Sequence, residues 1–239
     1  EKEVREAFKQ IFSEKKVGTI VVTCFASNVA RLETILKVSE EFNKVCLFLG
    51  RSIHKIYESA TENDYLINQK NIINEKDLKS VSNEDVVLIC TGSQGEPNAA
   101  LSNLVNDNNK NIKLSKNDLV IFSSREIPGN EKKINKLKEK ILKIGCEIYD
   151  QNTRMVHVSG HPSKKELKKM YKWINPNTII PVHGEYRHLN EHKKFARSCG
   201  IKNQILVQNG DLVLIKKDDQ SKIIKKVNFG RNILKGKQI

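Results

Sequence analysis

Short apolar runs rich in β-branched residues alternate with segments of helical periodicity along this chain of 239 residues. Such runs predict buried strands, and the segments between them predict helices. Strands are expected at Thr19–Cys24, Val45–Leu49, Val86–Cys90, Leu119–Phe122, Met155–Val158, Thr178–Val182, Gln204–Val207 and Leu212–Ile215. Helices are expected at Val29–Glu41, Pro97–Val105, Glu131–Ile144 and Lys164–Ile174. This alternation favours an α/β fold with a largely parallel sheet.

Two of the expected helices carry signals for their ends. The segment Glu131–Ile144 is followed by Gly145, a residue that commonly ends helices. The segment Lys164–Ile174 follows Ser163, which forms a Ser-x-x-Glu capping box with Glu166. We therefore expect both helices to have well-defined bounds.

The chain begins at Glu1 without an apolar leader and has no apolar run near the roughly 18 residues that a membrane helix needs. We expect no signal peptide and no membrane segment, and we expect Glu1 not to be the natural first residue. Five cysteines without a Cys-x-x-Cys pair suggest reduced core residues of a cytosolic protein. The length suits one large domain or two smaller ones.

Positive charge is concentrated in the second part of the chain. The net charge of +14 divides into −2 for residues 1–100 and +16 for residues 101–239. A basic surface attracts polyanions such as nucleic acids. The alternative is a lysine-rich solvated surface without a partner.

Small and polar residues follow the expected strands directly. The carboxyl ends of parallel strands form the ligand crevice of open α/β sheets, and helix N-termini there offer N–H groups to anions. We expect these loops to converge on one cleft for phosphate. As alternatives, Gly92 and Gly95 serve only as turn formers, and Arg51 and Arg125 are ordinary surface residues. The loops are Phe25–Asn28, Gly50–Ser52, Thr91–Pro97 and Ser123–Glu131.

Two segments concentrate the histidines that have a spacing signal, His157-Val-Ser-Gly-His161 and Pro181-Val-His183-Gly-Glu185. One helix between two strands is expected to separate them, so both should leave the same edge of one sheet. The His157 and His161 spacing alone is weak evidence for a metal. The remaining histidines carry no spacing signal and are expected in surface or core roles; they are His54, His188 and His192.

Several long motifs together resemble ribonuclease J, of the β-CASP branch of the metallo-β-lactamase fold. They occur in the family's order and cover nearly the whole chain. The motifs are Thr23–Asn28 (TCFASN), Thr91–Pro97 (TGSQGEP), Ser123–Glu131 (SSREIPGNE), His157–His161 (HVSGH), Pro181–Glu185 (PVHGE), Asn209–Asp211 (NGD) and the region of Gly230 and Arg231.

The resemblance implies a β-CASP domain over residues 1–155, with a parallel sheet flanked by helices. It implies the returning carboxyl-side part of a metallo-β-lactamase αββα domain over residues 156–239. It also implies that His161 supports the transition state and that His183 is a zinc ligand. By the same resemblance the RNA phosphate is held by His157, Val158, Ser159, Gly160 and His161.

A site with two zinc ions, or manganese in their place, is implied for the complete enzyme. The family's His-x-His-x-Asp-His zinc motif is absent from these 239 residues. We therefore expect a carboxyl-side fragment that is inactive alone.

The resulting hypothesis is a zinc-dependent ribonuclease that cleaves RNA as a 5′-to-3′ exonuclease and an endonuclease in maturation and decay. RNA is the expected partner, the location is cytoplasmic, and the full-length protein is expected to form a homodimer or homotetramer. Two alternatives stay open: a non-catalytic RNA-binding or assembly module, and a lactamase-fold hydrolase of small esters or thioesters.

Overall fold

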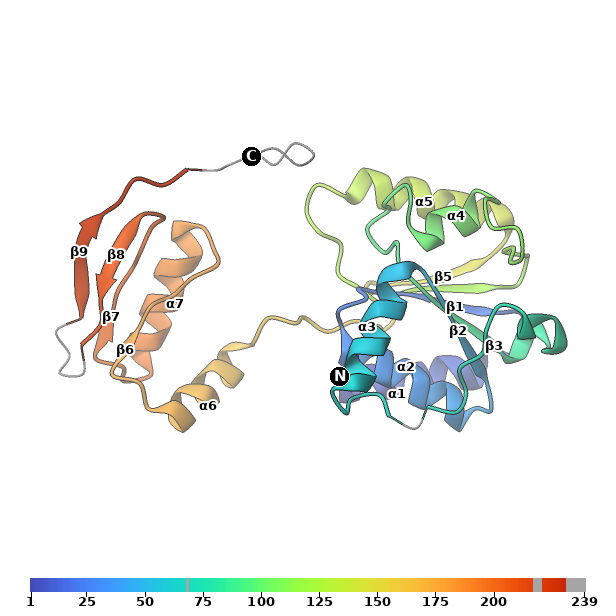
Figure 1. Ribbon diagram of the computed structural model, residues 1–239, viewed down its shortest axis with the longest axis horizontal. Helices are drawn as coiled ribbons and strands as arrows, with labels where there is room; N and C mark the ends of the chain where they lie inside the picture. The colour runs from blue at the N-terminus through green and yellow to red at the C-terminus, as the bar shows by residue number, and fades with distance from the viewer. Residues whose placement is uncertain (68, 217–220, 231–239) are drawn as a thin grey trace. The chain divides into compact units, whose positions relative to one another are not determined.

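The computed structural model describes residues 1–67, 69–216 and 221–230. The chain forms two compact units, unit 1 (Glu1–Ser159) and unit 2 (Gly160–Ile239), as Figure 1 shows. The expected domain boundary after residue 155, and the identity of residues 156–239 as the returning lactamase portion, stay predictions. Arg231, part of one motif, lies outside the described residues.

Unit 1 is built on a parallel sheet of five strands in the order β2-β3-β1-β4-β5. The prediction of a largely parallel sheet is therefore confirmed. The central strand β1 has Ile20, Val21 and Val22 fully buried, and burying such side chains contributes roughly 1.5–3 kcal/mol each. The strands are β1 (Ile20–Thr23), β2 (Val45–Leu49), β3 (Val86–Cys90), β4 (Leu119–Phe122) and β5 (Glu147–Tyr149).

Helices cover both faces of this sheet (Figure 1). Alternate residues of β1 face opposite sides, so Ile20 and Val22 pack with α1, α2 and α3, whereas Val21 packs with α4 and α5. Burial on both faces explains why the strands read as continuous apolar runs. The helices are α1 (Lys2–Glu14), α2 (Val29–Glu41), α3 (Arg51–Glu62), α4 (Ala100–Val105) and α5 (Glu131–Ile144), with 3-10 turns η1 (Asp77–Ser80) and η2 (Asn83–Asp85).

Unit 2 contains two helices and two small sheets. Strands β6 and β7 pair in parallel, and β8 and β9 pair antiparallel. Helix α6 begins with the predicted capping box, in which Ser163 and the Glu166 side chain bond each other's backbone N–H groups. A small core around Tyr171, Ala196 and Ile201 joins the two helices. The elements are α6 (Lys164–Ile174), β6 (Thr178–Ile179), α7 (Tyr186–Ser198), β7 (Asn203–Gln204), β8 (Asp211–Leu214) and β9 (Lys222–Lys226).

The prediction of a strand at Met155–Val158 is wrong. This segment has no strand pairing, because Val156 is fully buried in the core and its carbonyl group accepts a hydrogen bond from the side chain of Arg31. The expectation that both histidine segments leave one edge of a single sheet falls with it, since β6 pairs with β7 in a separate two-stranded sheet.

Cysteine burial agrees with the sequence. All five cysteines are free, and four of them are buried, with Cys199 partly exposed. Among the helices that the structure describes, none is long and apolar enough to span a bilayer.

Candidate functional site

The structure brings two of the predicted site residues together in unit 2. His161 precedes helix α6, and His183 lies in the loop between β6 and α7. Their ring centroids are 5.9 Å apart, with an angle of 31° between the ring planes. Both side chains are exposed, so a substrate or an ion can reach them.

His183 has a backbone conformation that L-residues rarely adopt. Its φ angle of 63° lies in the left-handed region, which costs a residue with a Cβ atom roughly 1–2 kcal/mol. The next residue, Gly184, lies close to helix α7, since an added Cβ atom would lie 3.0 Å from the Cβ of His188. Backbone strain of this kind is concentrated at functional sites. The sequence did not reveal it.

The described residues do not fit a complete zinc site. No group of three or more His, Cys, Asp or Glu side chains in the described ranges is arranged to hold a metal. Zinc sites in proteins need at least three protein ligands, so the pair of imidazoles falls short. In the described part of the chain, His183 can supply one metal ligand, but the residues there do not form a complete metal site.

His157 lies in unit 1, in the segment that follows β5. Its imidazole is half-buried, and this burial lowers its pKa below the ordinary value. The positive charges of Arg31 and Arg125 act in the same direction. The ring is therefore neutral at pH 7. Val158 packs against the core of unit 1, whereas Ser159 and Gly160 are exposed.

Arg31 on helix α2 holds this segment in place, and the sequence did not reveal its role. Its side chain is fully buried and donates hydrogen bonds from Nη1 to the carbonyl oxygens of Ser123 at 3.1 Å and Val156 at 2.9 Å. Nε and Nη2 bind the carboxylate of Glu1 at 2.7 and 3.0 Å. Burial alone would raise the pKa of Glu1, but the hydrogen bonds and charge of Arg31 outweigh it and lower that pKa. Arg31 therefore fixes the backbone immediately before His157.

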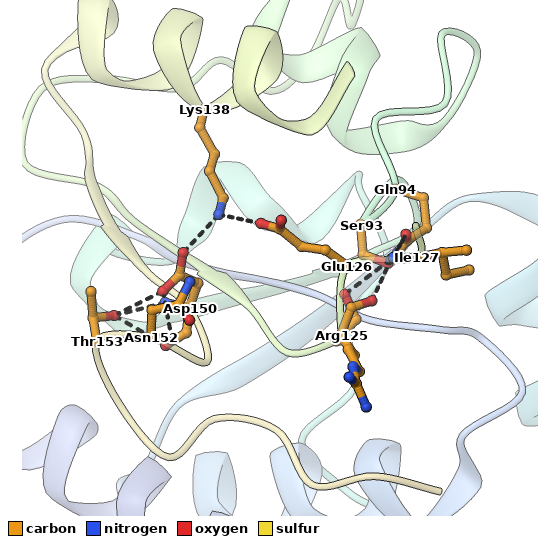
Figure 2. A network of polar contacts seen from close by, with 10 residues as sticks. Ser93, Gln94, Arg125, Glu126, Ile127, Lys138, Asp150, Asn152 and Thr153 are labelled. Atoms are coloured by element: carbon orange, nitrogen blue, oxygen red, sulfur yellow. Dashed lines mark hydrogen bonds and ion pairs between the residues drawn. The ribbon is translucent and has the colours of Figure 1, made fainter. Parts of the chain in front are cut away.

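A second anchor joins the loops that follow β3 and β4. The buried amide of Gln94 donates to the carbonyl oxygen of Arg125 at 2.9 Å and accepts from the N–H of Ile127 at 2.9 Å. Figure 2 shows these contacts beside Lys138, which binds Glu126 at 2.8 Å and Asp150 at 2.7 Å. These hydrogen bonds and ion pairs therefore hold both loops in fixed positions within unit 1.

The predicted single cleft is only partly present. A cavity of about 680 Å³ lies where the loops after β2 and β3 meet, and its lining includes Gly50, Arg51, His54 and Thr91. Residues of the loops after β1 and β4 do not line this cavity. Asn28 in the first loop accepts a hydrogen bond from the backbone N–H of Arg31, and Arg125 in the second accepts one from Gln94. Arg125 stays outside the cavity.

The histidines without a spacing signal have the structural or surface positions expected of them. The ring of His54 packs edge-on against Phe48, with centroids 5.9 Å apart. His192 forms a hydrogen bond with the hydroxyl group of Tyr171, and His188 is exposed on α7.

Comparison with known proteins gives two adjacent family matches. Residues 17–141 match the ribonuclease J β-CASP domain, and residues 141–206 match the Zn-dependent metallo-hydrolase RNA specificity domain. The second description implies that members of this family use a metal.

Relatives with the name ribonuclease J occur in several bacteria. The protein of Sinorhizobium meliloti is 36% identical over 213 residues, which are 89% of this chain and 38% of the relative. That of Helicobacter pylori (strain J99) is 33% identical over 216 residues, 89% of this chain and 31% of the relative. That of Mycoplasma genitalium is 31% identical over 220 residues, 90% of this chain and 38% of the relative.

The chain thus spans 31–38% of the length of these relatives. The resemblance first seen in the motifs is confirmed by both family matches and by these relatives. The α/β fold of unit 1, with helices on both faces of a parallel sheet, agrees with the matched β-CASP domain. The chain belongs to the ribonuclease J family.

Proposed function

We propose that this chain is part of a metal-dependent ribonuclease that hydrolyses RNA phosphodiesters. In the full-length protein it would act as a 5′-to-3′ exonuclease and an endonuclease in RNA maturation and decay. The observation that carries the proposal is the 5.9 Å separation of the His161 and His183 rings, together with the left-handed backbone of His183. The basic balance of residues 101–239 supports a polyanionic substrate.

Each site residue has a separate proposed role. His183 is one ligand of a zinc centre, which binds two ions in the complete protein and can accept manganese in their place. His161 stabilises negative charge that develops on the phosphate, because an imidazole N–H can donate a hydrogen bond to it. The segment His157–His161 holds the RNA phosphate through the Ser159 hydroxyl and the Gly160 backbone. Val158 anchors the segment through its apolar contacts with the core.

The test compares His183→Ala with His188→Ala in the full-length protein. His188 is a suitable control because it is also an exposed histidine of unit 2, and the proposal gives it no role. We expect His183→Ala to lower the zinc content and to reduce the rate of RNA hydrolysis by a factor of about 100. His188→Ala should change neither. Unchanged zinc content and hydrolysis in His183→Ala would exclude the metal role.

A non-catalytic RNA-binding or assembly module is the second candidate, and the lysines exposed on helix α6 favour it, namely Lys164, Lys165, Lys168, Lys169 and Lys172. It predicts RNA binding that weakens with salt but no hydrolysis by the full-length protein. Hydrolysis that depends on His183 would exclude it.

Assembly and location complete the proposal. We place the full-length protein in the cytoplasm as a homodimer or homotetramer. Light scattering on the purified full-length protein would measure its mass, and a monomer would contradict the assembly.

A further inference from the structure

The arginine that follows strand β4 has a fixed backbone and an exposed side chain. Arg125 is exposed, while its carbonyl oxygen accepts the 2.9 Å hydrogen bond from the amide of Gln94. The same amide accepts a hydrogen bond from the N–H of Ile127 at 2.9 Å, so both ends of the Gln94 side chain hold this loop. The loop is therefore ordered on the two sides of Arg125.

Two further contacts fix this arrangement to helix α5. Lys138 binds the carboxylate of Glu126, the residue after Arg125, at 2.8 Å. Gly95, the residue after Gln94, lies so close to α5 that an added Cβ atom would lie 2.8 Å from the backbone carbon of Lys133. The backbone of Arg125 is thus positioned from both the loop after β3 and the helix that follows.

The guanidinium group of Arg125 takes no part in this network. Figure 2 shows the side chain pointing away from Gln94 and Lys138. Among the described residues, no carboxylate forms an ion pair with it, whereas Arg31 binds Glu1 and Arg154 binds Glu14 at 3.0 Å. An arginine on a rigid loop with an unpaired guanidinium group suits an oxyanion, which it can bind with two parallel hydrogen bonds.

The positive charge of Arg125 acts on His157, in the segment proposed to hold phosphate. It contributes, after burial and Arg31, to the lowered pKa of His157 in the same unit. Arg31 ties Ser123, two residues before Arg125, to Val156, the residue just before His157. Arg125 and His157 therefore flank one region of unit 1.

We propose that Arg125 binds a phosphate group of the RNA chain beside His157, and that Gln94 is the residue that positions it. This inference rests on the proposed function, because it assigns the substrate contact to an RNA phosphodiester. It makes the loop after β4 a second part of the substrate-binding surface, in addition to the segment His157–His161.

The experiment measures RNA binding without hydrolysis. The full-length protein is titrated with a single-stranded RNA bearing a 5′-monophosphate, in the presence of EDTA, at several salt concentrations. We expect Arg125→Gln to weaken binding about tenfold and to reduce the slope of log affinity against log salt by about 0.7, the value for one phosphate contact on a single strand. Arg125→Lys should retain the slope, since it keeps the charge.

Lys79→Gln is the matched control for charge removal. Lys79 is exposed in η1, which precedes η2 and the amino end of β3, whereas Arg125 follows the carboxyl end of β4 in the same parallel sheet. The Lys79 substitution removes one positive charge from the same unit, and we expect unchanged affinity and salt slope.

Gln94→Ala tests the positioning role. We expect it to weaken RNA binding as Arg125→Gln does, and the double variant to be no weaker than either single variant, because both changes remove the same contact. Independent losses that multiply in the double variant would overturn the positioning role.

The results also separate this inference from the proposed function. Unchanged affinity and salt slope in Arg125→Gln, with RNA hydrolysis by the unaltered protein, would overturn the inference and leave the proposed function in place. An unaltered protein that neither binds nor hydrolyses RNA would overturn both.

Discussion

The guanidinium group of Arg31 donates a hydrogen bond of 2.9 Å to the carbonyl oxygen of Val156, the residue that precedes His157. This contact links helix α2 to the segment that carries the first predicted substrate-binding residue. A side chain takes the place of a neighbouring strand as the hydrogen-bond partner of this backbone.

Removal of this anchor should destabilise unit 1. In Arg31→Met the carbonyl groups of Ser123 and Val156 lose their buried donor and Glu1 loses its ion pair, so we expect a loss of about 2–4 kcal/mol in the free energy of unfolding. Urea denaturation followed by circular dichroism measures it. Lys37→Met removes only an exposed pair with Glu33 and should change the stability by less than about 0.5 kcal/mol. Equal effects of the two substitutions would contradict the role of Arg31.

The Lys138 ion pairs should stabilise unit 1 within a defined pH range. Burial alone would raise the pKa of Asp150, but the bonds to Lys138 and to the backbone outweigh it and lower that pKa below 3.8. Burial alone would lower the pKa of Lys138, but Asp150 and Glu126 outweigh it and raise that pKa above 10.5. The stabilisation by Asp150 is present above about pH 4 and is lost as the pH falls further. That by Lys138 is present below about pH 10 and is lost as the pH rises.

The test compares the unaltered chain with Lys138→Met in urea at several pH values. The difference in unfolding free energy should be largest near pH 7 and smaller at pH 2.5 and pH 11. A difference that does not vary with pH would show that Lys138 acts through packing alone, for example over the ring of Phe122, whose centroid is 5.2 Å from Nζ.

The left-handed backbone of His183 predicts an unusual order of stability among its variants. At a φ angle of 63°, glycine has no steric penalty, whereas alanine keeps it. We expect His183→Gly to be more stable than His183→Ala by about 1 kcal/mol, although both lose the proposed ligand. Thermal denaturation of unit 2, followed by the fluorescence of Trp173, measures the difference. Equal midpoints would show that the loop relaxes around alanine.

Thiol labelling should distinguish Cys199 from the other cysteines. Burial raises the pKa of Cys24 and Cys46 to about 12 and that of Cys146 to about 11, and it raises the pKa of Cys90 further. Thiolate is the reactive form, so at pH 8 these four should react slowly in the native chain. Cys199 is partly exposed and should react first. Rapid reaction of more than one thiol before denaturation would contradict the burial of the others.

Apolar runs and helical periodicity were sufficient to predict the bounds of elements whose apolar residues follow a regular pattern. The bounds of β2, β3 and β4 and of helices α2, α5 and α6 agree with the sequence prediction. Helices α3 and α7 were not predicted. They bury only Ile53 and Ala60 in α3 and Ala196 in α7, and neither has a side-chain N-cap, whereas α6 buries only Tyr171 but begins with a capping box. Strand β5 is only three residues long, which is too short for a pattern. Helix α1 does have an apolar stripe, and the prediction overlooked it.

The candidate site was predictable only in part, for a related reason. Motifs identified His161 and His183, and the structure places their rings near each other. Arg31 and Gln94 act through partners far along the chain, so no local pattern indicates their contacts, although Gln94 lies within the Thr91–Pro97 motif. Gln94 binds backbone atoms 31 and 33 residues away, and Arg31 binds Val156 over 125 residues. The false strand at Met155–Val158 has the same origin, because a distant side chain satisfies its backbone.

The partners of Arg31 also set an order of events during folding. They come from the first residue of unit 1, from the end of β4 and from the segment before His157, at separations of 30, 92 and 125 residues. Contacts of such long range form late, because the cost of closing their loops precedes any gain. During synthesis this cluster can close only after Val156 has left the ribosome. The segment that carries His157 is therefore among the last parts of unit 1 to become ordered.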